Sequence, residues 1–539
     1  MSRGKKLFSM SLLTLIVLIA VGVISKNNGD PGGTGSTLAN STKVATNNPL
    51  GLTKVPVSQV GLNQLTSGVA HLGISINMTW LLLTGFLVLF MQVGFAFLVT
   101  GLTRAKNAGH MMMMNLSSFV IALLVYYAVG FAFQFGGVGA IANLGGTGPL
   151  SGIFGHGNAG IIGTHGFFLQ TGGTYDVGVM AFFLFQVVFM ETAGYILIGA
   201  IAERITFAAF ICAEIAMAAI IYPVYGMWVW GGGWLAHLGS SLDLGHGAVD
   251  FAGSGVVHAT GGWSAMALAM LLGARIGKYR KDGSVRAFPG HDLGYVVLGT
   301  LVLTFGWMDF NPGSTFGATD LRIGVVAVNT LLSASAGAVA AMAWTNWKWG
   351  KPDISMTCNG MLAGLVAITA PCAFVAPWAS IVIGMLAGFL VCLSVGFFDT
   401  KARIDDPCGA ISVHGVCGAF GVLMVGLFAD GTYGEGWNGI TGKVTGIFYG
   451  GSGWGQMLAQ AIDVVVGFIW AWGMMYLIFI VLRRWVKMRV DPEVEIAGLD
   501  EAEFGQYCYP DFQLVTDTQG GFPGEFDHGD AVGTEGSTK

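Results

Sequence analysis

Charged residues are scarce in this sequence. Asp, Glu, Lys and Arg together make up 10% of its 539 residues, whereas a soluble protein carries about 25%. Hydrophobic residues make up 53%, and the mean hydropathy is +0.67. This balance excludes an ordinary soluble domain and predicts an integral membrane protein that crosses the bilayer many times.

An excess of positive charge and catalytic motifs are also lacking. The formal net charge is −5 at pH 7, which argues against nucleic acid as a partner. No HExxH or GxSxG motif occurs, so the sequence does not indicate an enzyme. A membrane enzyme remains an alternative that a tightly bound metal would support.

Metal-binding patterns are weak as well. The seven cysteines lie almost all in apolar stretches without CxxC spacing, and we interpret them as small packing residues. The run HMMMM at 110–114 contains metal-binding residue types. Four consecutive Met residues cannot share one helix face, because successive residues are about 100° apart. The sequence therefore predicts no metal and no cofactor.

The ends of the chain differ from its middle. Residues 1–25 have a basic start and an apolar stretch typical of a signal peptide, with an uncleaved anchor as the alternative. Residues 26–75 are rich in Gly, Asn, Ser and Thr and are interpreted as a poorly ordered external polar segment. We assign residues 76–489 to a membrane domain and residues 490–539 to an acidic, polar cytoplasmic tail.

Eleven apolar runs are long enough to cross a membrane as helices. They lie at 78–102, 113–136, 176–199, 204–226, 251–275, 292–312, 321–347, 355–373, 377–398, 408–430 and 457–482. Lys and Arg gather in the connections after odd-numbered runs, which predicts an external N-terminus and a cytoplasmic C-terminus. The connection 137–175 has no Lys or Arg and is either a cap over an outer vestibule or a flexible loop.

Two of these runs carry a histidine eight residues after an aspartate. His258 follows Asp250, and His414 follows Asp406. At about 1.5 Å per helical residue, each histidine lies roughly 12 Å inside its helix, near the middle of a hydrocarbon core about 30 Å thick. Because the two runs are expected to enter from opposite sides, their imidazoles should meet at an intramembrane site. The alternative is two N-cap aspartates and two unrelated histidines bonded to backbone.

Both runs resemble motifs of the ammonium transporter family, which includes ammonium transporters, methylammonium permeases and Rh proteins. The first shares the opening DFAG at 250–253 and the closing GAR at 273–275; the second shares DDPC at 405–408 and HGVCG at 414–418. The resemblance implies an all-α integral membrane protein with eleven transmembrane helices, built as a 5+5 inverted repeat plus one C-terminal helix, N-out/C-in. It also implies a homotrimer with one pore per subunit, in the plasma or inner membrane of the cell.

The resemblance further assigns roles to single residues. They are recruitment of ammonium by Trp230, Ser314 and Phe189, gating by Phe189 and Phe310, a pore lined by His258 and His414, and structural support from Asp250, Asp406 and Gln186. Moving a bare cation into low dielectric costs on the order of 20 kcal/mol in the idealised limit. Aromatic rings offset part of this cost by cation–π contact, and imidazole exchanges protons near neutral pH.

Plainer interpretations exist for the same residues. Trp230 alone fits an interfacial anchor, the phenylalanines fit a packed core, and Ser314 after Asn-Pro-Gly fits a helix end that satisfies its own backbone. Asp250 and Asp406 fit caps that fix the helix starts rather than cation ligands.

Three positions depart from the family pattern. Glu191 and Asp309 stand beside the expected gate residues, where the family has neutral residues, and carboxyls there are costly unless protonated, paired or hydrated. Either they are tucked against other helices, or they are modifiers that add a proton or cation site and slow passage. In the tail, Phe504 stands where the family has His.

These features predict an ammonium transporter or channel. It would recruit ammonium outside, deprotonate it, and conduct ammonia, with or without a proton, through a twin-histidine hydrophobic pore. Methylammonium is an expected second substrate, and a PII-type regulatory protein is an expected partner on the cytoplasmic face. The alternatives are an ammonium sensor with little or no transport and Rh-like conduction of carbon dioxide.

Overall fold

The computed structural model describes residues 62–136, 153–156, 159–170 and 174–510. The expected signal peptide, most of the expected external segment, the first part of the connection 137–175 and the tail beyond residue 510 lie outside the described residues.

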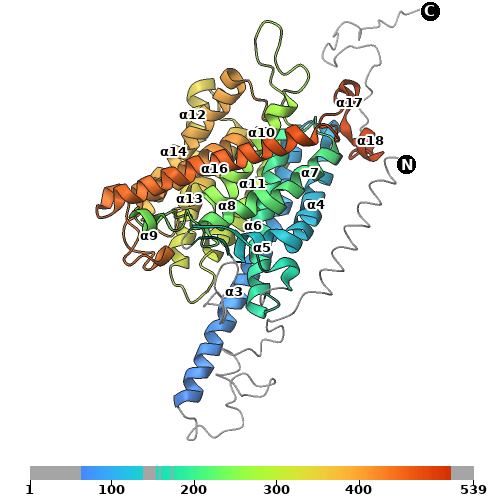
Figure 1. Ribbon diagram of the computed structural model, residues 1–539. Coiled ribbons are helices and arrows are strands. Elements are labelled where there is room, and N and C mark those ends of the chain that lie inside the picture. Colours follow the sequence, from blue (N-terminus) through green and yellow to red (C-terminus); the bar gives the residue numbers. More distant parts are fainter. Residues whose placement is uncertain (1–61, 137–152, 157–158, 171–173, 511–539) are drawn as a thin grey trace, which may run out of the picture.

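Helices make up nearly all of the described chain (Figure 1). The α-helices are α3 (Leu62–Leu102), α4 (Ala108–Val125), α5 (Phe131–Phe135), α6 (Val177–Ile201), α7 (Phe207–Ala216), α8 (Tyr222–Val229), α9 (Leu238–Leu242), α10 (Thr260–Leu272), α11 (Leu293–Gly313), α12 (Ile323–Trp349), α13 (Ile354–Thr369), α14 (Pro377–Phe397), α15 (Cys417–Phe428), α16 (Gly453–Leu482), α17 (Pro492–Ala497) and α18 (Leu499–Phe504). Strands β1 (Ile153–His156) and β2 (Ala159–Gly163) form one antiparallel hairpin.

Five π-helical segments extend or join these helices. They are η4 (Tyr126–Gly130), η7 (Met217–Ile221), η8 (Ser254–Ala259), η9 (Phe398–Ala402) and η10 (Ile411–Val416). Short 3₁₀ turns are η3 (Ala105–Asn107), η6 (Phe167–Leu169), η11 (Trp437–Gly439) and η12 (Ile447–Tyr449). Such π-turns inside helices are rare and occur often at functional sites.

Ten helical stretches of the described residues are long and apolar enough to cross a membrane. They coincide with ten of the eleven expected runs. The remaining run, 355–373, corresponds to α13, which has 16 residues and is too short to meet the same criterion. The multi-pass, helical architecture is therefore as predicted, and the count of eleven crossings stays a prediction.

The first membrane helix is longer than expected. Helix α3 begins at Leu62 and projects beyond the bundle in Figure 1, so the expected irregular chain up to residue 75 is wrong from residue 62 onward. The composition of this extension suggested irregular chain, because Gly, Ser and Asn occur there. Leu62, Leu65, Val69 and Leu72 nevertheless recur at steps of three and four, the period of a helix.

Helix α6 lies at the centre of the bundle, whereas α16 lies across its outside (Figure 1). Of the residues in an 18-residue apolar stretch of each helix, 89% are buried in α6 and 22% are buried in α16. A helix that is apolar on every side, as α6 is, belongs in an interior. Helices α3 and α6 run parallel, since Gln92 bonds Glu191 and, farther along both helices, Arg104 bonds Glu203.

The helices that carry the two histidines cross in antiparallel directions at very close range. A β-carbon at Gly262 would lie 2.1 Å from the backbone nitrogen of Gly415, and one at Gly418 would lie 2.4 Å from the carbonyl oxygen of Ser254. Only glycine fits at these two crossings. The close backbone approach brings residues 258 and 414 level with each other.

A buried ionic cluster joins the ends of these helices on one side of the bundle. The Arg275 guanidinium donates to Glu203 Oε2 at 2.9 Å and to Asp405 Oδ2 at 2.8 Å. Burial alone would raise the pKa of Glu203, but the charges of Arg275 and Arg104 outweigh it and lower the pKa to about 2. The cluster therefore holds two carboxylates ionised among arginines.

The tail packs against the same side. Arg489 donates to the carbonyl oxygens of Leu272 at 2.8 Å and Ala274 at 2.7 Å, which caps the end of α10. The Asp500 carboxylate accepts from the backbone N–H groups of Gly109 and His110, both at 2.8 Å, at the start of α4. Residues 490–510 are thus an ordered part of the fold.

Candidate functional site

His258 and His414 meet inside the protein, as the Asp–His spacing predicted. Their Nδ1 atoms are 3.2 Å apart, and their ring centroids are 5.3 Å apart with an interplanar angle of 27°. His258 is completely buried and His414 is 5% exposed. The two rings come from η8 and η10, so both histidines stand on π-helical turns.

Each histidine helix is started by its aspartate. The Asp250 carboxylate accepts four backbone N–H groups, from Gly253, Ser254, Gly255 and Val256, at 2.8 to 3.0 Å. Asp250 therefore has the geometry of a helix cap.

Asp406 caps the second helix in the same way. It accepts from the N–H groups of Gly409, Ala410 and Ile411 at 2.7 to 3.0 Å. Gly253 and Gly409 each stand three residues after the aspartate in the left-handed region, with φ of 112° and 78°. The shared pattern is Asp, Gly three residues on and His eight residues on.

The two expected gate rings lie against each other. Phe189 of α6 stacks on Phe310 of α11 with a centroid separation of 3.9 Å and an angle of 20°. On one side Phe189 is 6.3 Å from Trp230, and on the other Phe310 is 5.6 Å from His258. The rings of Trp230, Phe189, Phe310, His258 and His414 therefore form one continuous row.

The polar groups expected near the outer end of this row are partly engaged. Trp230 Nε1 donates to the carbonyl oxygen of Asp250 at 2.7 Å. The Ser314 hydroxyl donates to the Phe310 carbonyl oxygen of its own helix at 2.8 Å, as the plainer interpretation predicted. A hydroxyl that donates in this way still has lone pairs that can accept an N–H group.

Gln186 has an unused acceptor. It lies one helical turn before Phe189, is 2% exposed, and its Oε1 makes no hydrogen bond. A buried carbonyl without a partner is costly. The residue expected to give only structural support is therefore also able to accept an N–H group from a ligand or a water.

Trp307 was missed by the sequence reasoning. It is fully buried, its ring stacks 4.9 Å from His258 at 21°, and its Nε1 donates to Thr369 Oγ1 at 2.9 Å. Phe310 lies three residues later, on the same helix face. That spacing within GWMDF was the available signal.

Glu191 lies against another helix, which is one of the two alternatives that the sequence left open. Glu191 stands two residues, or about 200°, around α6 from Phe189, and its Oε2 accepts from Gln92 of α3 at 3.1 Å. It therefore faces away from the row of rings. Asp309 is only partly buried on α11, and Phe504 packs 5.0 Å from Phe207 and 5.6 Å from His110.

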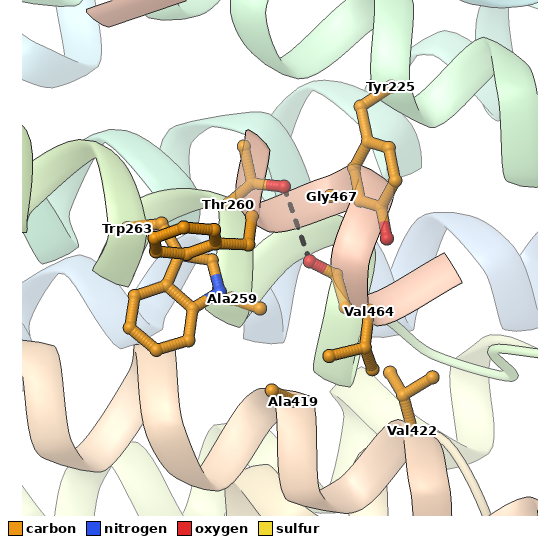
Figure 2. A pocket seen from close by; sticks show the side chains of 10 residues that line it. Tyr225, Ala259, Thr260, Trp263, Ala419, Val422, Val464 and Gly467 are labelled. Carbon is orange, nitrogen blue, oxygen red and sulfur yellow. Dashed lines mark hydrogen bonds between the residues drawn. The ribbon is translucent and has the colours of Figure 1, made fainter. Parts of the chain in front are cut away.

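Two small cavities flank the histidine helices. One of about 20 Å³ is lined by His414, Phe95 and Tyr195, which is enough for a single small molecule such as water. The other, of about 10 Å³, lies on the side of α10 that faces α16 (Figure 2). Thr260 there donates to the Gly255 carbonyl oxygen at 3.2 Å, and neither histidine lines this second cavity.

A row of buried rings that leads to a histidine pair, inside a bundle of membrane-length helices, indicates a multi-pass membrane protein with a buried histidine site. The model of the Ammonium Transporter Family matches residues 79–509, and the chain belongs to this family. The family consists of transporters rather than enzymes, and the resemblance seen in the sequence is confirmed.

Similar proteins come from several kingdoms. The chain is 46% identical over 446 residues to ammonium transporter Amt2 of Archaeoglobus fulgidus, which covers 82% of this chain and 90% of that protein. A solved structure described as a sensor Amt protein has a TM-score of 0.70 and 36% identity, over 80% of this chain and 99% of that one. Mep2 of Candida albicans has a TM-score of 0.67 and 26% identity, over 81% and 92%.

Proposed function

We propose that this protein conducts ammonium nitrogen across a cell membrane as neutral ammonia. The observation that carries the proposal is the row from Trp230 through Phe189 and Phe310 to His258 and His414. A hydrated cation cannot enter a row so tightly packed without losing its water, and a bare charge there costs many kcal/mol. A small neutral amine avoids that cost.

Recruitment falls to the outer end of the row. The face of Trp230 offers a cation–π contact worth about 0.5–2 kcal/mol. The hydroxyl oxygen of Ser314 and the unpaired Oε1 of Gln186 can each accept an N–H group. Ammonium held there loses a proton near the Phe189–Phe310 contact, because the rings beyond it favour the neutral form.

The histidine pair then guides ammonia inward. His258 Nε2 is buried and makes no hydrogen bond, so it can bond a passing ammonia molecule. The cavity beside His414 has the volume to receive that molecule next. Asp250 and Asp406 fix the two helix starts and so hold the imidazoles in line.

The wider architecture remains part of this proposal. The repeated Asp, Gly and His pattern on antiparallel helices supports a 5+5 inverted repeat with one further helix, N-out/C-in. We also infer a homotrimer in the plasma or inner membrane, methylammonium as a second substrate, and a PII-type protein that binds the cytoplasmic face.

Uptake by reconstituted protein tests the central claim. A jump in ammonium concentration should produce a current on a solid-supported membrane that carries the protein. A transport-deficient host that expresses the protein should take up methylammonium. The double variant His258→Ala, His414→Ala should abolish both the current and the uptake, whereas Trp347→Ala, on the exposed surface of α12, should not. Undiminished flux in the double variant would remove the histidines from the mechanism.

A second function, ammonium sensing with little transport, is supported by two observations. One related structure is described as a sensor Amt protein, and the 3.9 Å contact of Phe189 with Phe310 closes the row. Calorimetric binding of ammonium by the purified protein, together with absent flux in the same proteoliposomes, would favour sensing.

A further inference from the structure

A second group of buried polar side chains lies behind α6, away from the row of rings. Glu191 and Tyr195 come from α6, Glu214 from α7, Gln92 from α3 and Ser118 from α4. Glu191 is 1% exposed, Glu214 is completely buried, and Tyr195 is 2% exposed. Four helices thus enclose two carboxyl groups at membrane depth.

The carboxyl groups have few partners. Glu191 Oε2 accepts from Gln92 Nε2 at 3.1 Å, and its Oε1 makes no hydrogen bond. Neither oxygen of Glu214 has a partner of normal hydrogen-bond geometry, although the Ser118 hydroxyl lies nearby and acts on it. Among the described residues, no Lys, Arg or His forms an ion pair with either carboxyl.

The position of Glu214 is built into the backbone of α6. A β-carbon at Gly194 would lie 2.5 Å from Glu214 Oε2. The Glu214 carboxyl therefore occupies the space that a side chain at position 194 would need. Gly194 follows Glu191 by three residues and therefore shares its helix face. Both carboxyls consequently lie on the same side of α6, with Glu191 bonded to Gln92 of α3 and Glu214 reaching in from α7.

Two carboxylates in such a place cannot both be ionised. The Glu214 carboxyl lies against Gly194, one helical turn from Glu191 on the same face of α6, so the two carboxyls are close enough to repel each other electrostatically. Without a basic partner, burial and mutual repulsion both favour the neutral form. At least one proton is therefore needed to hold this pair inside the protein.

Tyr195 connects the pair to the outside of its enclosure. Its hydroxyl is buried and makes no hydrogen bond, and Tyr195 follows Glu191 by four residues on the same face of α6. Its ring stacks on Phe95 at 5.4 Å and lines the cavity of about 20 Å³ that His414 also lines. The tyrosine thus stands between the carboxyl pair and the cavity.

We propose that Glu191 and Glu214 form a proton-binding site that exchanges protons with the cavity beside His414 through the Tyr195 hydroxyl. When a proton donor in the cavity gives up a proton, its N–H or O–H bond breaks and a Tyr195 O–H bond forms. The tyrosine passes its original proton to the ionised carboxylate, and a carboxyl O–H bond forms. The cavity's place on the ammonia route rests on the proposed function, but proton binding by the pair does not.

Infrared difference spectroscopy tests the site directly. In a pH titration of the purified full-length protein, a protonated carboxyl C=O band should persist at neutral pH. It should change in frequency or intensity in Glu214→Gln and in Glu191→Gln, and should be lost in the double variant, in which amides replace both carboxyls. It should remain unchanged in Glu493→Gln, which changes an exposed tail residue. Transfer into deuterated buffer should shift the band, at least tenfold more slowly in Tyr195→Phe than in the wild type.

Each outcome bears on one claim. A band that is unchanged in both Glu→Gln variants would overturn the proton site, and equal exchange rates in Tyr195→Phe and wild type would overturn the path through Tyr195. In a third outcome, the reconstituted wild type carries no ammonium current while the carboxyl band is present and exchanges more slowly in Tyr195→Phe. In that case the proton site stands and the proposed conduction fails. Gly194→Ala, which intrudes on the Glu214 carboxyl, should move the band without removing it.

Discussion

The ring of Phe189 lies flat on the ring of Phe310 with centroids 3.9 Å apart. That separation is van der Waals contact, so neither water nor ammonium fits between the two rings. Because Phe310 also lies 5.6 Å from both His258 and Trp307, it is the ring that separates the Trp230 end of the row from the histidines. Passage requires at least one of the two rings to swing aside.

Truncation of Phe310 should therefore weaken selectivity more than truncation of Phe189. In Phe310→Ala, water can reach His258, and hydrated potassium should compete with ammonium on the order of tenfold better, the effect of about 1.4 kcal/mol. Phe189→Ala leaves the inner ring in place and should change the ratio less. The ratio of potassium current to ammonium current is measured after concentration jumps of each ion on a supported membrane. Phe397→Ala, which changes an exposed side chain, serves as control. A larger change of this ratio in Phe189→Ala than in Phe310→Ala would contradict the expected order.

The crossing of the two histidine helices should tolerate no side chain at residue 262. Gly262→Ala places a methyl group 2.1 Å from the backbone nitrogen of Gly415, and overpacking of this kind costs at least about 2 kcal/mol. Gly473→Ala, which meets nothing within 4 Å on α16, should instead stabilise its helix by about 0.5–1 kcal/mol. Thermal unfolding in detergent compares the two; equal midpoints would argue against the close crossing.

Acid should destabilise the ionic cluster at Glu203. Its pKa is about 2 in the folded protein and near 4.5 when unfolded, so its contribution is full above about pH 4.5 and is lost as the pH falls toward 2. The contribution is about 3 kcal/mol. The unfolding midpoint should fall more between pH 6 and pH 3 in the wild type than in Glu203→Gln. An equal fall in both proteins would count against the Arg275–Glu203 pair as the cause.

The ordered part of the tail should be released by loss of Phe504. Phe504→Ala removes ring contacts with Phe207 and His110, although the Asp500 bonds to the start of α4 remain. Limited proteolysis should cut residues 490–510 several-fold faster than in the wild type. Ile496→Ala, which truncates a side chain that is 60% exposed, should be cut at the wild-type rate; similar rates for both variants would show that the aromatic contact is unimportant.

Features set by local spacing could be predicted from the sequence. The meeting of His258 and His414 followed from two equal Asp-to-His distances on runs of opposite direction. The capping by Asp250 and Asp406 followed from their places at the helix starts. In each case the decisive residues lie within one or two turns of each other, where helical geometry leaves little freedom.

Features set by partners distant in sequence could not be predicted in this way. Trp307 matters because it packs on His258, and Glu191 faces Gln92 and Glu214 rather than its sequence neighbour Phe189. Proximity along a helix places side chains on different faces, so adjacency to the gate was misleading. The carboxyl pair became visible only once the Glu214 side chain of α7 was seen to lie against Gly194 of α6, one helical turn from Glu191.

A single hydrogen atom fits between the facing Nδ1 atoms of His258 and His414. Whichever neutral imidazole carries that hydrogen leaves its own Nε2 bare, and the other must then be the Nε2–H tautomer. The dyad thus has a direction, with an acceptor at one end and a donor at the other. Reversing that direction requires a coordinated change of tautomer in both rings.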